Sequence, residues 1–141
     1  MIRNYLVCKA DFPHECTLTD RTDEPIPAGR ELAEHLHSIL QNHTSGITEV
    51  WNHEDFGWSF NCDWENTTIN VLIAFHDEER WLIIFIIVSL IPWFLRSRKY
   101  DVSLGRFCEK IDSVARADER FSDLRWFTPA EYAEFERPKK R

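Results

Sequence analysis

The chain contains no lysine or arginine between residues 31 and 79, a gap of 49 residues within a sequence of 141. This block carries ten acidic side chains and a net charge of −10, whereas residues 1–30 carry −1 and residues 80–141 carry +4. A negative field of this extent repels nucleic acid and attracts a basic partner. The alternative interpretation is a solvated acidic face. We therefore expect no nucleic-acid partner.

Glycine, proline and cysteine are also scarce, with four, six and four residues respectively. Low glycine and proline contents argue against a repetitive or disordered chain. The four cysteines form no Cys-x-x-Cys pair, and no apolar leader precedes them. We therefore expect reduced thiols in a cytoplasmic protein.

Motifs that carry catalysis are missing as well. The sequence has no glycine-rich phosphate loop, no nucleophile elbow and no HExxH pair. His35 and His37 are two positions apart in an expected helix and so do not share a face. Cys8, His14 and Cys16 match no zinc-finger spacing. We therefore expect no catalytic residues, no metal site, no cofactor and no enzymatic activity.

What is present predicts one α+β domain over residues 1–141, with a loop at 13–26 and a frayed basic tail at 137–141. Trp58, Phe60, Cys62 and Trp64 alternate with polar residues, which is typical of a half-buried strand. Further strands are expected at 69–75 and from Trp81 on, with weaker ones at 1–12 and 47–51. The expected sheet is an antiparallel meander of four to five strands.

Three helices complete the expected fold. Apolar residues recur at helical spacing over 27–41 and 102–117, which predicts two main helices packed on one face of the sheet. A short C-terminal helix should follow Thr128, because Thr128-Pro129-Ala130-Glu131 combines a capping box with proline at the first helical position.

One hydrophobic run, WLIIFIIVSLIPWFL from Trp81 to Leu95, needs a separate explanation. It is shorter than the roughly 20 apolar residues of a membrane-spanning helix, and Pro92 interrupts it. Its β-branched and aromatic residues favour a strand with two apolar faces, and we expect no membrane span. One face, with Leu82, Ile84 and Ile86, is covered either by this chain, by a second copy in a homodimer, or by a partner.

The run RFCEKIDSVARADERFSDLRWFTPAEY, Arg106 to Tyr132, resembles the ends of short bacterial proteins, some of them encoded near polymorphic toxins. As a small acidic α+β chain, the protein also resembles bacterial immunity proteins, which neutralise a cognate toxin. The resemblance implies stoichiometric binding that blocks the active site of the toxin.

Charge and resemblance together suggest a partner-binding surface for a basic toxin. It would combine acids for fast, selective association with aromatic anchors for affinity. The expected residues are Glu54, Asp55, Asp63, Glu65, Asp77, Glu78, Glu79, Trp58 and Trp64. Two alternatives stay open: a small-ligand or enzymatic domain with a cleft between sheet and helices, and a homodimeric structural protein joined through Leu82, Ile84 and Ile86.

Overall fold

The computed structural model describes residues 2–13, 17–18, 25–26, 28–53, 57–77, 80–91, 93–96 and 98–137. The elements along the chain are β1 (Tyr5–Ala10), β2 (Thr17–Leu18), β3 (Pro25–Ile26), α1 (Arg30–Leu40), β4 (Gly46–Ile47), β5 (Trp51–His53), β6 (Gly57–Trp64), β7 (Thr67–Asp77), β8 (Arg80–Val88), the 3-10 turn η1 (Trp93–Leu95), α2 (Arg98–Arg116), β9 (Phe121–Phe127) and α3 (Pro129–Glu136).

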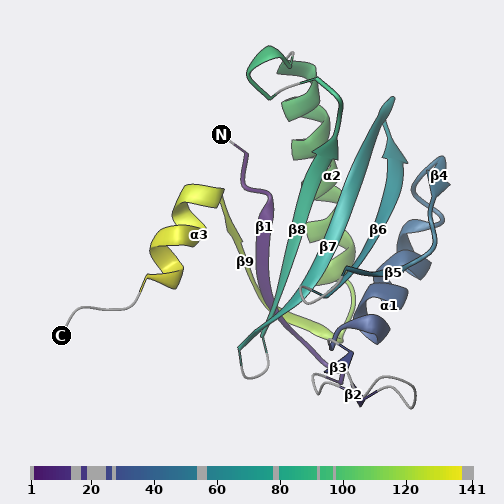
Figure 1. Cartoon of the computed structure of the whole chain (residues 1–141), viewed down its shortest axis with the longest axis vertical. Helices are drawn as coiled ribbons and strands as arrows, with labels where there is room; N and C mark the ends of the chain where they lie inside the picture. Colours follow the sequence, from purple (N-terminus) through teal and green to yellow (C-terminus); the bar gives the residue numbers. More distant parts are fainter. Residues whose placement is uncertain are drawn as a thin grey trace.

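An antiparallel sheet of seven strands forms the centre of the fold (Figure 1). Its order is β4-β6-β7-β8-β1-β9, and β5 also pairs with β6, next to β4. The strands β6, β7 and β8 form the expected meander. Trp58 of β6 lies opposite Ile73 of β7, and Thr68 of β7 lies opposite Val88 of β8. The short strands β2 and β3 pair only with each other.

The expectation of four to five strands was too small. The weak strand near the N-terminus inserts between β8 and β9, so it has a partner on each side. The segment at 46–53 contributes two short strands instead of one, and both pair with β6. The β1 pairings join segments far apart in sequence, and β4 and β5 pair over only two or three residues, so residue periodicity does not reveal them.

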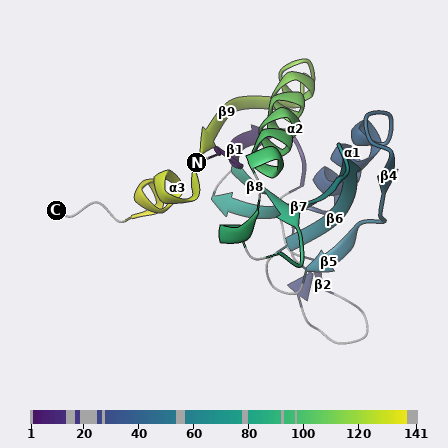
Figure 2. The same cartoon turned by 90° about the horizontal axis from the view of Figure 1, so that it is seen from above.

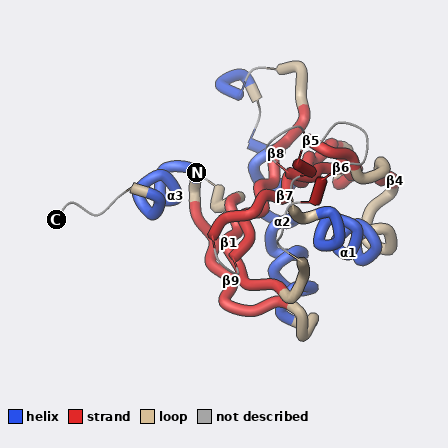
Figure 3. Tube along the Cα trace, turned by 60° about the horizontal axis from the view of Figure 1, so that its bottom comes forward, coloured by secondary structure: helices blue, strands red, loops and turns tan. Residues whose placement is uncertain are grey.

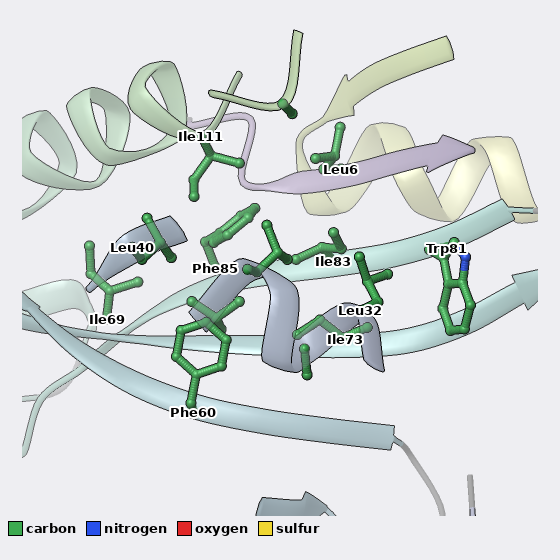
Figure 4. Packing of buried hydrophobic residues seen from close by; sticks show 14 of the residues in the cluster. Leu6, Leu32, Leu40, Phe60, Ile69, Ile73, Trp81, Ile83, Phe85 and Ile111 are labelled. Atoms are coloured by element: carbon green, nitrogen blue, oxygen red, sulfur yellow. The ribbon is translucent and has the colours of Figure 1, made fainter. Parts of the chain in front are cut away.

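Helices α1 and α2 cover one face of the sheet, as expected (Figure 2). Their apolar stripes meet the inward side chains of the strands, and this layer is the hydrophobic core (Figure 4). Alternation decides which strand residues enter it: Ile69, Val71 and Ile73 of β7 are fully buried, whereas the residues between them are only half-buried.

The third helix lies apart from the other two, beside the N-terminus (Figure 2). It begins at the predicted capping box: the Thr128 hydroxyl accepts from the Glu131 amide, and the Glu131 carboxylate accepts from the Thr128 amide. The centroid of its Tyr132 ring lies 5.3 Å from that of the Tyr5 ring on β1 and 6.0 Å from that of the His76 ring on β7. Because β8 runs between β1 and β7, Tyr132 crosses over β8 on the face opposite to α1 and α2.

Candidate binding surfaces

The residues without lysine or arginine fold into one side of the molecule, which we call the acidic side: α1 and the strands β4 to β7 (Figure 1). Helix α1 packs on β6, and the short strands β4 and β5 extend the sheet from β6. Glu31, Glu34 and Glu49 are exposed there, and Arg30, at the start of α1, pairs only with Glu34 among them. The charge asymmetry of the sequence thus becomes an asymmetry of the surface.

The structure brings together only part of the expected partner-binding set. Asp63 and Glu65 lie where β6 turns into β7, whereas Asp77 lies at the far end of β7. Thr67 and Asp77, at the two ends of β7, are ten positions apart, which corresponds to a distance of roughly 30 Å along the strand. Glu54, Asp55, Glu78 and Glu79 lie outside the described residues.

Glu65 is engaged within the chain. The Arg106 guanidinium of α2 donates to both of its carboxylate oxygens at 2.9 Å, and the Ser103 hydroxyl donates at 3.1 Å. Arg106 is the main reason why the pKa of Glu65 is lowered. This acid fastens the β6–β7 turn to α2, so its charge is largely compensated before any partner arrives.

Trp58 and Trp64 pack in or against the hydrophobic core. Trp58 is buried, and the Arg30 guanidinium lies over its ring, 5.6 Å from the centroid. Trp64 is half-buried: its indole N–H donates to the Ser103 carbonyl at 3.1 Å, and its ring meets Phe107 edge-on at 5.4 Å. Both side chains join sheet to helix, so neither is presented as an exposed aromatic anchor.

The histidines in α1 have separate partners. His35 Nε2 lies 2.6 Å from Asp118 Oδ2, and His37 Nε2 lies 2.9 Å from the Thr48 carbonyl oxygen. Among the described residues, no group of three or more His, Cys, Asp or Glu side chains could hold a metal ion. His14 and Cys16 lie outside that part of the chain. Cys8, Cys62 and Cys108 are buried free thiols.

A contact that the sequence did not reveal joins β7 to α3. His76 lies at an irregularity in the β7–β8 pairing, and its side chain is almost fully buried. Its Nδ1 lies 3.0 Å from Glu136 and 3.2 Å from the Tyr132 hydroxyl, which donates to Glu136 at 2.9 Å. Burial, followed by the hydrogen bond to Glu136, raises the pKa of Tyr132. Tyr132 and Glu136 are one helical turn apart, the only sequence signal for this contact.

The outer face of β8 is covered over half its length. Leu82 and Ile84 are half-buried at the end crossed by Tyr132, whereas Ile86 and Val88 are 44% and 49% exposed. The expected oligomer face, Leu82, Ile84 and Ile86, is therefore partly occupied by this chain's own α3.

Beyond β8 the chain exposes more apolar surface, which we call the apolar tip: Leu90, Ile91, Phe94 and Leu95. Leu90 is fully exposed, and Phe94 and Leu95 are each 66% exposed. Figure 3 shows this segment extending past the end of the sheet. Three cations follow it directly, Arg96, Arg98 and Lys99, which we call the basic rim. The pattern of the run predicts a strand and its return, whereas the structure exposes the segment after β8.

A groove of about 480 Å³ lies between the N-terminal segment and α2. Its polar lining is largely engaged: Arg3 pairs with Glu131, and Asp112 pairs with Arg116 and accepts from the Trp126 indole. Burial raises the pKa of the Cys108 thiol to about 12, so this thiol is protonated near neutral pH and is a poor nucleophile.

Comparisons with protein-family models, curated proteins and solved structures found no match for this chain. No helix in the described parts of the chain has the length and apolar character needed to cross a membrane. The function must therefore be argued from the surfaces themselves.

Proposed function

We propose that this chain is a non-enzymatic binding module of the immunity or inhibitor type, which neutralises a basic protein toxin by stoichiometric binding at its acidic side. One observation carries the proposal: the described residues of the 49-residue block without lysine or arginine occupy a contiguous side of the fold. Such a field raises the association rate with a cationic protein and disfavours acidic competitors.

The acids that contribute most are those without a compensating cation. Glu31 and Glu49 are exposed and form no ion pair with another described residue, whereas Glu65 is held by Arg106. Asp63 is exposed and accepts a hydrogen bond from Thr68, which fixes its carboxylate at the edge next to β4. We expect the basic partner to contact these three acids rather than the tryptophans.

Binding is supported over catalysis by the state of the polar groups around the groove between the N-terminal segment and α2. Arg3, Asp112 and Arg116 are held in ion pairs, and the Cys108 thiol is not activated. A general base or nucleophile needs a perturbed pKa matched to its task, and burial shifts this thiol away from that value.

A differential pull-down from extracts of the source cell tests the proposal. The baits are the wild-type chain, Glu31→Lys/Glu49→Lys, and the matched control Glu119→Lys/Glu134→Lys, which places the same charge change on the other half of the molecule. We expect one basic protein to be retained by the wild type and the control and lost with the acidic-side variant. Equal retention by all three baits, or retention of acidic proteins only, would contradict the proposal.

A further inference from the structure

We propose that the apolar tip and the basic rim dock this protein on a membrane surface that contains anionic lipids. This is a second contact, separate from the partner at the acidic side and carried by different residues. The tip lies on the segment between β8 and α2, at the top of the molecule in Figure 1.

Exposure is the first argument. Six of the ten large apolar side chains exposed among the described residues fall between Ile86 and Leu95. Exposed apolar side chains that gather in one segment mark an interaction site, whereas scattered ones are normal. Leu90 gains nothing from the fold, because its side chain is fully accessible to water. Insertion into the boundary between headgroups and acyl chains would bury it.

Charge is the second argument. From Arg80 to Tyr100 the sequence has four cations and no acid. Arg98 and Lys99 are exposed and form no ion pair with any residue that the structure describes. The nearest acid beyond them is Asp101, in the first turn of α2. Cations placed directly beside inserted apolar side chains match the phosphate level of an anionic bilayer.

Arg96 gives the tip a defined shape. Its guanidinium Nε donates to the Ile91 carbonyl oxygen at 3.1 Å, which closes the segment that carries η1. The Ile91 amide in turn donates to the Ser89 hydroxyl at 3.1 Å. A closed loop loses less conformational entropy on insertion than an open one.

The same features disfavour a second copy as the occupant. A symmetric dimer through the tip would bring the basic rim of each copy near that of the other, and like charges in contact are unfavourable. The tip also projects beyond the sheet, whereas pairing of the outer faces would need the flat surface that α3 partly occupies (Figure 3). A lipid surface accepts a projecting tip without a matching pocket.

Vesicle co-sedimentation tests the inference with the full chain alone. The probes are phosphatidylcholine vesicles with and without phosphatidylserine. We expect the wild type to sediment with the phosphatidylserine vesicles, and added salt to weaken the binding. Arg98→Glu/Lys99→Glu should lower the partition coefficient about 30-fold or more, since each cation near such a surface strengthens binding by about fivefold. Leu90→Asp/Leu95→Asp should lower it about 100-fold.

The matched control is Ser38→Asp/Ser113→Asp, which adds two acids at exposed positions of α1 and of the C-terminal half of α2. It should bind nearly as the wild type does. All substituted side chains are exposed, and circular dichroism shows whether each variant is folded. No binding by the folded wild type would overturn the inference, as would equal binding by the tip variant. A dimer in light scattering that the tip substitutions dissolve would assign the tip to a second copy instead.

Discussion

At the scale of single residues, two glycines show how differently the fold uses the same residue type. Gly57 opens β6 with φ 144°, and an added Cβ would clash with the Ile73 carbonyl oxygen. Gly105 lies within α2, where an added Cβ would meet only Ile2 at 3.6 Å. Gly57 is therefore required by backbone conformation and by close packing of strands, whereas Gly105 is replaceable.

The first prediction compares these positions. Gly57→Ala should lower the free energy of unfolding by about 3 kcal/mol or more, because it combines a strained backbone with a clash against a neighbouring strand. Gly105→Ala should raise it by about 0.5–1 kcal/mol, since alanine favours the helix and the space is open. Urea unfolding of both variants measures the two changes. Equal changes in the free energy of unfolding for the two variants would show that Gly57 does not pack closely against the Ile73 carbonyl oxygen.

At the scale of elements, α3 is held to the sheet mainly by side chains near its two ends. At its start, the Arg3 guanidinium donates to both carboxylate oxygens of Glu131, at 3.0 and 3.2 Å. Near its end, Tyr132 and Glu136 meet the buried His76. None of its residues is fully buried, so polar contacts matter more for α3 than for α1 or α2.

The second prediction concerns the start of α3. Arg3 first, and then the Thr128 amide, lower the pKa of Glu131 from 4.5 to about 2. A depressed folded-state pKa means that the stabilisation is present above about pH 5 and is lost as the pH falls towards about 2. We therefore expect Glu131→Gln to lower the Tm near neutral pH, with the difference from the wild type shrinking over that window.

Thermal unfolding at a series of pH values measures the effect. Glu134→Gln is the control, because it removes one carboxylate from the same helix at a position outside the capping box. If the Tm difference between Glu131→Gln and the wild type stays constant from neutral to acidic pH, ionisation of Glu131 does not contribute to stability.

The predictable elements were those with a local signal. Residue periodicity gave α1, α2 and the strands β6, β7 and β8, and the Thr128 capping box gave α3. The pairings of β4 and β5 with β6 cover only two or three residues, and the place of β1 between β8 and β9 depends on contacts between distant segments. The docking of α3 on the outer face depends on Arg3 and on the buried His76, both distant from α3 in sequence, and no pattern distinguishes either residue.

At the scale of the whole molecule, the fold separates the charges that the sequence had already separated. Residues 31–77 form the side with α1 and β4 to β7, and residues 80–137 form β8, α2, β9 and α3. The sequence could therefore predict that an acidic surface exists. It could not predict the strand register that places Asp63, on β6, opposite Thr68 and far from Asp77 at the end of β7. Nor could it predict that Arg106 compensates Glu65, because that pair depends on packing between elements.

The most direct test of the proposed acidic docking side is the association rate of the basic protein that the wild-type bait retains, measured by stopped flow at increasing ionic strength. We expect an association rate that falls steeply with salt. Glu31→Lys/Glu49→Lys should lower this rate about tenfold or more at low salt, while Glu119→Lys/Glu134→Lys should leave it nearly unchanged. A rate independent of salt and equal for both variants would contradict this expectation.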